Sequence, residues 1–406
     1  MTEPAATAVM AALSRAGGED CARFVGGCVR NTLMKAPVGD IDIATTLTPE
    51  AVIAALRAAN LKAVPTGAAH GTITAVAHGR PFEITTLRRD VETDGRHAKV
   101  AFTDDWAEDA ARRDFRLNAL YADARGRLFD PTGQGVADAR AGRIVFVGDP
   151  LARIAEDALR ILRFFRFLAW YGRGAADAAG LAACEEMRAA VAGLSAERVA
   201  KELLTLLAAE DPRAAVRLMA EAGVLGLILP EATGAARFET LVAIETGMLF
   251  SEDPLLRLAA LLPGDPAAGA AVAARLRLSN AQRDRLVAAL GSEPVLVSWM
   301  SPRQMRQAVW GLGAQTFCDR VTLAWAASER PAGAMQWRAL LPMAQGWSRP
   351  ALPLSGEEVA AAGVPRGPLI GAVLREIEAW WIDNDFTADK LSVVERLKSV
   401  VQGMVY

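Results

Sequence analysis

A glycine-led helix followed closely by an Asp-x-Asp strand is the feature that most restricts how this chain can fold. Both lie in residues 24–50, FVGGCVRNTLMKAPVGDIDIATTLTPE. Gly26 and Gly27 open the predicted helix, where backbone N–H groups and the positive end of the helix can hold an anion. Arg30, one turn later, adds a cation suited to phosphate oxygens. The stretch therefore predicts a phosphate-binding turn.

The strand predicted at residues 40–43 carries two carboxylates on one face. Because side chains alternate along a strand, Asp40 and Asp42 project together while the isoleucines between and after them pack behind. Two carboxylates beside a phosphate-binding turn predict a catalytic Mg²⁺ site for nucleotide chemistry. The alternative is a tight glycine turn followed by an exposed Asp-x-Asp. It explains the glycines and the two aspartates separately, but not their occurrence together with the motifs below.

Composition sets the bounds for the rest of the chain. The 406 residues, 52% hydrophobic and 23% charged, fit a protein of several domains with well-formed cores, and strand-forming residues thin out in the second half. The four cysteines form no CxxC pair and there are three histidines, which disfavours structural zinc and a histidine-based metallohydrolase. A formal charge of −2 does not indicate nucleic-acid binding, so such a role needs local basic patches.

The chain carries no recognisable targeting or membrane segment. No apolar run reaches the roughly 18 residues of a membrane span. The N-terminus MTEPAATAVM lacks the basic region of a secretory signal. We therefore expect a cytoplasmic protein that does not associate with membranes, and the residues carry no indication of an oligomeric state.

Three strand-like segments follow the opening stretch: LKAVPT, GTITAVAH and PFEITTLRRD. In the third, Glu83 stands between two apolar residues and could supply a third catalytic carboxylate on a neighbouring strand, completing a two-metal cluster. A solvent-facing strand glutamate has the same pattern. A turn is then predicted at residues 93–95, a mobile loop at residues 96–97, and a last strand at residues 144–147.

A dense charge cluster at residues 112–114 precedes the apolar run of the segment DFRLNALY. Arg113 could clamp triphosphate oxygens, and Asp114 could accept a hydrogen bond from a ribose hydroxyl. An ordinary ion pair on a helix surface is the alternative. On the local residues alone, that alternative is the simpler explanation.

After residue 150 the pattern LARIAEDALRILRFFRFLAWYG predicts one long amphipathic helix, and from residue 194 onward only short helices are predicted. Asp157 and Arg160, three residues apart, could present acceptors and donors to the edge of a planar base. A plain i,i+3 salt bridge is the competing interpretation. It is disfavoured because the cations of this helix outnumber its acids. The cations are Arg153, Arg160, Arg163 and Arg166.

Six segments, in order, closely resemble the class II tRNA nucleotidyltransferases, which comprise the CCA-adding enzymes and bacterial poly(A) polymerases of the polymerase-β superfamily. They are FVGGCVRN, GDIDIATT, FEITTLRRDVETDGRHAKVAF, ARRDFRLNALY, RLFDPTGQGVADARAGRIVFVGDP and RIAEDALRILRFFRF. The resemblance is strong over residues 20–170 and fainter beyond. It implies an α+β chain whose small polymerase-β-like nucleotidyltransferase head, a mixed sheet with helices, spans residues 1–148. An all-α neck and body (149–260) and an all-α tail (261–406) would follow and bind tRNA.

The resemblance also implies roles for the residues of the first two motifs. Asp40 and Asp42 would hold Mg²⁺, and the helix opened by Gly26 and Gly27 would hold the triphosphate together with Arg30. One position departs from the family pattern. The Asp that usually follows this arginine is Asn31 here, which can still accept a hydrogen bond.

The later motifs would handle the sugar, the base and the order of addition. Arg113 and Asp114 match residues that grip the phosphates and sugar of the incoming nucleotide. Asp157 and Arg160 match the pair that reads the base edge of CTP or ATP. Arg163 and Arg166 continue that nucleotide-binding motif, and residues 94–97 fall in the loop that helps the switch from C to A addition.

The predicted function is therefore Mg²⁺-dependent addition of CCA to tRNA 3′ ends from CTP and ATP, with release of pyrophosphate. A poly(A) polymerase, or an enzyme that adds only CC or only A, is the alternative within the family. A non-catalytic RNA-binding protein built on an inactive head is disfavoured because Asp40, Asp42, Arg113, Asp157 and Arg160 are all kept. A dinucleotide-binding oxidoreductase is disfavoured because GGCVRN is not a GxGxxG motif.

Overall fold

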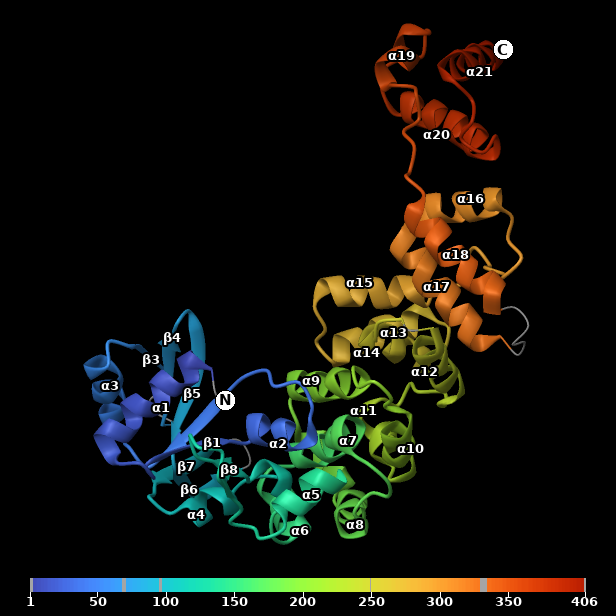
Figure 1. Ribbon diagram of the computed structural model, residues 1–406. Helices are drawn as coiled ribbons and strands as arrows, with labels where there is room; N and C mark the ends of the chain where they lie inside the picture. Colours follow the sequence, from blue (N-terminus) through green and yellow to red (C-terminus); the bar gives the residue numbers. More distant parts are fainter. Residues whose placement is uncertain (1–2, 68–70, 95–96, 249, 329–333, 405–406) are drawn as a thin grey trace. The chain divides into compact units, whose positions relative to one another are not determined.

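The computed structural model describes residues 3–67, 71–94, 97–248, 250–328 and 334–404 (Figure 1). The chain forms two compact units. Unit 1 contains residues 1–232, 252–254 and 275–277, and unit 2 contains residues 233–251, 255–274 and 278–406. The predicted boundaries at residues 148 and 260 lie within these units and stay predictions.

Unit 1 begins with a seven-stranded mixed sheet in the order β3-β4-β5-β2-β1-β8-β9. The pair β2–β5 is parallel, and the other neighbours are antiparallel. The strands are β1 (Ala22–Val25), β2 (Asp42–Thr45), β3 (Lys62–Gly67), β4 (Thr72–Ala77), β5 (Arg80–Thr86), β8 (Tyr121–Ala122) and β9 (Leu128–Phe129). The three strands predicted between residues 61 and 90 are thus confirmed as β3, β4 and β5.

Helices α1 (Pro4–Gly17) and α3 (Pro49–Ala58) pack against each other and against β4. Helix α3 begins where the sequence predicts: the Thr48 side chain accepts a hydrogen bond from the Ala51 N–H at 3.4 Å, and Pro49 takes the first helical position. Helix α2 (Gly27–Met34) contacts β1, from which the glycine turn leads into the helix. The sheet and these helices position the proposed site.

The predicted turn and loop at residues 93–97 fall within a two-stranded hairpin, in which His97 is the first residue of a strand and not part of a loop. Strands β6 (Arg88–Asp94) and β7 (His97–Phe102) pair from Arg88↔Phe102 to Asp94↔His97. The connecting residues 95–96 lie outside the described part of the chain. Each strand contains valine, which favours strands, and the Asp-Gly pair between them is typical of a hairpin turn.

Two other expectations of regular structure are corrected. Strand β2 begins at Asp42, so Asp40 precedes it and the two do not share a strand face. Residues 144–147 make an isolated bridge, Phe115↔Phe146, in place of a strand. The bridge does not extend because the chain turns into a 3₁₀ helix directly after Phe115.

The long helix predicted after residue 150 is broken at Asp157. Helix α6 (Pro150–Glu156) ends there and α7 (Leu159–Tyr171) follows, with Asp157 in an extended conformation (φ −152°, ψ 106°). The Asp157 carboxylate accepts a hydrogen bond from the Leu159 N–H at 3.0 Å. Such a local side-chain bond to the backbone competes with helical bonding, which explains the break.

Unit 1 is completed by short helices around an aromatic core. Phe115 packs against Phe146 and Phe167 with ring centroids 4.9 Å apart in each pair. The remaining elements are α4 (Trp106–Ala111), η2 (Arg116–Asn118), α5 (Gly135–Ala141), α8 (Ala178–Glu186), η3 (Arg188–Gly193), α9 (Ala196–Leu207), α10 (Arg213–Glu221) and α11 (Val224–Ile228).

In unit 2 every described element of regular structure is a helix, as predicted for this half of the chain. One core surrounds Phe317, and a second surrounds Trp381. The elements are α12 (Ala236–Met248), α13 (Pro254–Leu261), α14 (Pro266–Arg275), α15 (Asn280–Ala289), α16 (Pro302–Leu312), α17 (Ala314–Ala327), α18 (Ala334–Gly346), α19 (Gly356–Ala361), α20 (Pro368–Asp383) and α21 (Lys390–Gly403).

Among the described residues, no single helix has the length and apolar character of a membrane span. Helices α13 and α14 taken together have the length and composition of a membrane span, but the pair is bent by 119°.

Candidate active site

The glycine turn ahead of α2 is built as the sequence predicts. Gly26 caps the helix with φ 69° and ψ −124°, a conformation that side chains other than hydrogen disfavour. A Cβ atom placed on Gly26 would lie 3.6 Å from Nη1 of Arg113. The arginine predicted to hold phosphates therefore lies directly beside the turn predicted to hold phosphates, although 86 residues separate Arg113 from Gly27 in the sequence.

The carboxylates predicted to be catalytic lie at the start of β2 and in β5. Asp42 and Glu83 stand opposite each other in the parallel register of these strands. Burial, followed by the negative charges of Glu83 and Asp40, raises the pKa of the Asp42 carboxyl, and the Arg113 charge acts in the opposite direction. In the described part of the chain, no hydrogen bond or ion pair engages the side chains of Asp40, Asp42 or Glu83. The three acids thus form an edge of negative charge.

This edge fits a divalent cation that is bound together with a substrate. Within the described residues, no three His, Cys, Asp or Glu side chains are arranged to hold a metal ion by themselves. The expected cluster of three carboxylates is therefore not formed, because Asp40 lies outside β2. Mg²⁺ commonly uses one or two carboxylates together with substrate phosphates. Burial and like charge at Asp42 favour such an ion. The roles of Asp40 and Asp42 as protein ligands, and that of Glu83, stay predictions.

Arg113 is held from behind by a buried carboxylate. Asp109 accepts hydrogen bonds from Nη2 and Nε of Arg113 at 2.9 and 3.2 Å. The Tyr121 hydroxyl donates to the same Asp109 oxygen at 2.7 Å. The surface ion pair considered for residues 112–114 thus exists as an i,i+4 bridge from Asp109, but its carboxylate side chain is only 2% exposed.

Asp114 is buried, and its carboxylate is surrounded by protein donors. It accepts hydrogen bonds from the backbone N–H of Phe115 at 2.8 Å, from Asn118 Nδ2 at 3.0 Å and from Arg163 Nε at 2.8 Å. Burial would raise the pKa of the Asp114 carboxyl, but the Arg163 charge outweighs it and lowers the pKa. A ribose hydroxyl would have to share or replace one of these donors.

Arg30 faces the protein interior and is 7% exposed. It donates to Asn31 Oδ1 from Nε at 3.0 Å and to the Tyr171 hydroxyl at 2.7 Å. A third bond, 2.5 Å long, runs to Asn118 Oδ1. Asn31 in turn donates to the Pro37 carbonyl at 2.6 Å, which a carboxylate could not do. Arg30 therefore ties α2 to η2 and α7, and its predicted contact with triphosphate stays a prediction.

The proposed base-reading pair does not form an ion pair in this conformation. Asp157 accepts from Arg198 on α9 at 2.7 Å. Arg160 donates to Glu156 at 2.6 Å and to the Arg112 carbonyl at 3.2 Å. The simple i,i+3 salt bridge is therefore absent from the described bonds of these two residues, and each holds a different protein group.

Arg163 and Arg166 converge on Glu202, a residue of α9 that the sequence reasoning missed. Arg166 pairs with Glu202 directly, and Arg163 lies 3.9 Å from its other oxygen while also binding Asp114. Glu202 is 7% exposed. Its position on the apolar stripe of LSAERVAKELLTLL is the signal that could have found it, since a buried acid requires a partner.

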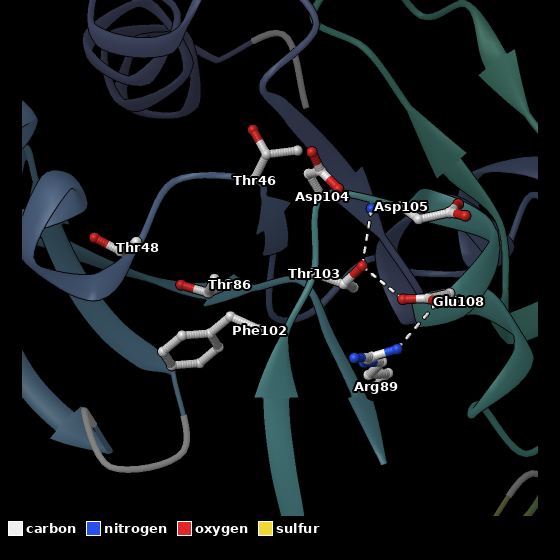
Figure 2. Close-up of a pocket in the computed structure, with 9 residues that line it drawn as sticks. All are labelled: Thr46, Thr48, Thr86, Arg89, Phe102, Thr103, Asp104, Asp105 and Glu108. Atoms are coloured by element: carbon white, nitrogen blue, oxygen red, sulfur yellow. Dashed lines mark hydrogen bonds and ion pairs between the residues drawn. The ribbon is translucent and has the colours of Figure 1, made fainter. Parts of the chain in front are cut away.

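A cavity of about 580 Å³ lies at the root of the hairpin. Figure 2 shows Thr86, the last residue of β5, beside the exposed ring of Phe102, and Glu108 bonded to Thr103; Thr46, which follows β2, also lines the cavity. The other lining residues are Thr48, Arg89, Asp104 and Asp105. The cavity lies where β2 and β5 end, since Thr46 follows β2 and Thr86 is the last residue of β5, whereas Asp42 stands at the start of β2.

Comparisons with known proteins find the same family along most of the chain. Residues 22–145 match the family described as Poly A polymerase head domain, and residues 177–235 match the one described as probable RNA and SrmB-binding site of polymerase A. The chain is 32% identical to CCA tRNA nucleotidyltransferase 1, mitochondrial, of Mus musculus, over 93% of this chain and 86% of that protein. It is 40% identical to the CCA-adding enzyme of Geobacillus sp. (strain WCH70), over 52% of this chain and 50% of that protein.

Solved structures of similar proteins share the fold. The Bacillus stearothermophilus CCA-adding enzyme in complex with CTP has a TM-score of 0.77 and 25% identity, covering 99% of this chain and 100% of that chain. The Thermotoga maritima CCA-adding enzyme complexed with tRNA_CCA has a TM-score of 0.70 and 20% identity, covering 98% and 96%. The α+β fold predicted from the sequence, a polymerase-β-like head followed by helices, is thereby confirmed.

Proposed function

The chain belongs to the family of the CCA tRNA nucleotidyltransferases, and we infer that it adds CCA to the 3′ ends of tRNA from CTP and ATP, releasing pyrophosphate. One observation of the site carries the inference. A turn suited to phosphate, a cation beside it and carboxylates that make no ion pair with other described residues lie together next to one sheet. Nucleotidyl transfer needs these three elements together.

We propose Mg²⁺ as the metal and Asp40 and Asp42 as its protein ligands. Families of this kind generally use a divalent metal. When bound, the ion would neutralise negative charge on the reacting phosphates and lower the cost of deprotonating the attacking hydroxyl. Asp42, fixed at the start of β2, would hold the ion in place. Glu83, opposite it in the register of β5, would add negative charge that attracts the ion.

Arg113 and the glycine turn would hold the triphosphate. The guanidinium is already aligned beside Gly26, so little side-chain entropy remains to be lost when phosphate binds. Asp114, fixed by Arg163 and Asn118, would receive the ribose by exchanging one of its donors. Arg30 would stabilise α2, and with it the glycine turn, through its bonds to Asn118 and Tyr171. Its contact with the triphosphate would be made at the same turn.

Asp157 and Arg160 would read the base after exchanging their protein contacts. Asp157 offers only acceptors and Arg160 only donors, which matches the exocyclic amine and ring acceptor shared by CTP and ATP. UTP and GTP present a carbonyl and an N–H instead, so both contacts would be mismatched in a desolvated site. Arg163 and Arg166 would keep this segment in place through Glu202.

We also propose that helical segments beyond about residue 190 provide the tRNA surface, since the matched RNA-binding family covers residues 177–235. The cytoplasm is the proposed location. A poly(A) polymerase is the second candidate, because the family matched by residues 22–145 is described by that activity.

The test uses tRNA ending at the discriminator base, incubated with labelled CTP and ATP separately and together. Two C residues followed by one A are expected. A ladder of A residues would assign the protein to poly(A) addition, and a single type of addition would assign it to a partial enzyme. Absence of any incorporation by folded protein in Mg²⁺ would contradict the function.

A further inference from the structure

Asp109, on α4, is a buried carboxylate to which none of the sequence motifs assigned a role. Its side chain is almost completely buried, with 1% of the residue exposed. One oxygen, Oδ2, accepts from Arg113 and Tyr121. The other, Oδ1, accepts from Nε of Arg112 at 3.0 Å and from the backbone N–H of Arg88 at 3.5 Å. Asp109 therefore joins three segments of the chain at one carboxylate: the end of α4 with the two residues after it, the start of β6 and the start of β8.

The bonds to Asp109 decide which donors of Arg113 remain for a ligand. Nε and Nη2 are used by Asp109. Nη1 makes no hydrogen bond within the described part of the chain, and it is this atom that lies beside Gly26. A guanidinium held by two of its nitrogens has a fixed plane, so the remaining donors point in one direction.

Asp109 stays charged while it does this. Burial alone would raise the pKa of the Asp109 carboxyl, but the charges of Arg113 and Arg112 outweigh it and lower the pKa to about 2. The Tyr121 hydroxyl completes the environment by donating to the same oxygen that Arg113 binds. The carboxylate is thus available as a fixed acceptor at neutral pH.

Helix α4 is itself anchored to the root of the hairpin, which makes it a firm base. Next to Asp109, Glu108 accepts from the Thr103 hydroxyl at 2.6 Å and lies 3.8 Å from Arg89 (Figure 2). Together with the bond from the Arg88 N–H, these contacts attach α4 to the first residues of β6 and to the residue after β7. Helix α4 is therefore held by several contacts that do not involve Arg113.

We propose that Asp109 is a positioning residue that fixes the Arg113 guanidinium with Nη1 directed at the Gly26 turn, and so sets the affinity of the site for the triphosphate of either nucleotide. This deepens the proposed function and rests on it. Because the triphosphate is common to both substrates, loss of Asp109 lowers the affinities for CTP and for ATP by the same factor. A residue that acted on the base would separate the two.

The test measures equilibrium binding of CTP and of ATP, and the KM and kcat of C addition, for Asp109→Asn. About a tenfold loss of affinity for each nucleotide is expected, with KM rising more than kcat falls, since the charge-assisted bonds are lost. Asp138→Asn is the matched control. Asp138 is also 1% exposed and paired with arginine, at 2.8 Å from Arg143, but it does not contact Arg113.

A double-mutant cycle with Arg113→Ala separates positioning from general damage. If Asp109 acts through Arg113, then Asp109→Asn changes CTP affinity by less than about twofold in the Arg113→Ala background. A full tenfold effect in that background, or an equal loss in Asp138→Asn, overturns the proposal. So does an unchanged CTP affinity in Arg113→Ala.

Tyr121→Phe covers the case in which Asp109→Asn does not fold. It removes the hydroxyl that donates to Asp109 and also accepts from Arg113 Nε at 3.3 Å, so both bonds that orient Arg113 are affected. About a twofold to threefold loss of affinity for each nucleotide is expected, again absent in the Arg113→Ala background. Retention of full affinity in Tyr121→Phe would overturn the proposal in that case. Nucleotide binding is measured without tRNA, so a protein that binds CTP through this pair but adds nothing to tRNA would contradict the proposed function and leave the positioning role standing.

Discussion

At the carboxylate edge of the sheet, Asp42 and Glu83 stand together without an ion pair in the described part of the chain, whereas the arginines of α7 are each held by a carboxylate. Arg160 holds Glu156, and Arg163 holds Asp114. The first region stores unfavourable like charge that a cation can relieve. The second has already neutralised its charge, so a nucleotide has to compete with protein carboxylates.

The difference indicates where binding and specificity come from. A cation gains affinity at the edge because nothing has to be displaced there. At α7, a base gains contacts only if the protein bonds of Asp157 and Arg160 are replaced by equivalent ones, and bases with the wrong donors and acceptors cannot do this. We therefore expect the carboxylates at the edge of the sheet to control the rate of transfer. Asp157 and Arg160 should control which nucleotide is chosen.

The largest effect is expected at the edge. Asp42→Asn should lower kcat for C addition by more than about 10³-fold, because metal-based charge stabilisation is worth several kcal/mol. The melting temperature should be unchanged or higher, since a partly buried carboxylate with like-charged neighbours is removed. Turnover and thermal unfolding measured on the same sample check both parts. Near-normal turnover in Mg²⁺ would remove Asp42 from the site.

A smaller effect, on choice rather than rate, is expected at α7. Replacing Asp157 and Arg160 together by Ala should raise the use of UTP and GTP relative to CTP and ATP by about 10²-fold, while overall rate falls, because mismatched buried polar groups cost a few kcal/mol. Competition assays with paired nucleotides measure the ratio. A double variant that keeps its full preference would show that the base is read by other residues.

The fixed Asp109–Arg113 pair should appear in acid unfolding. Because folding lowers the pKa of Asp109 from 3.8 to about 2, its contribution is fully present above pH 4 and is lost as pH falls through 2. The free energy of unfolding of the unsubstituted protein should exceed that of Asp109→Asn by on the order of 2 kcal/mol more at pH 5 than at pH 2. Urea unfolding across this range measures the gap, and a gap independent of pH would contradict it.

The smallest effect is expected at Asn31. Asn31→Asp keeps the acceptor for Arg30 but loses the donation to the Pro37 carbonyl, one exposed hydrogen bond. A change in stability below about 1 kcal/mol and a change in kcat/KM below about threefold are expected. Loss of more than tenfold in kcat/KM would mean that Asn31 acts on substrate and not only on Arg30.

Much of the fold was accessible from the sequence because local signals agreed with it. Thr48 and Pro49 predicted the start of α3, and the alternation in GTITAVAH predicted β4. The glycine pair predicted the start of α2. Strands β6 and β7 were not predicted, although the Asp-Gly pair between them was recognised as a turn signal. The break at Asp157 was missed because the helical periodicity continues through it, while a single side-chain bond to the Leu159 N–H interrupts the backbone.

The site was predictable in its residues but less so in its bonds. The sequence brought Gly26, Asp42 and Arg113 into one hypothesis, and the fold places them together. It could not indicate that Arg30 turns inward or that Asp157 pairs with Arg198, since those partners lie far along the chain. Asp109 was passed over because an acid in the first turn of a helix is usually an ordinary surface residue.

One measurement tests the contrast between the two regions most directly: a crystal structure of the protein with CTP and Mg²⁺. We expect that the 2.6 Å contact of Arg160 with Glu156 and the 2.7 Å contact of Arg198 with Asp157 are broken and replaced by contacts with the base. The 2.9 Å bond between Asp109 and Arg113 should be kept. Retention of both the Arg160–Glu156 and the Arg198–Asp157 contacts with CTP bound, or loss of the Asp109–Arg113 bond, would contradict this expectation.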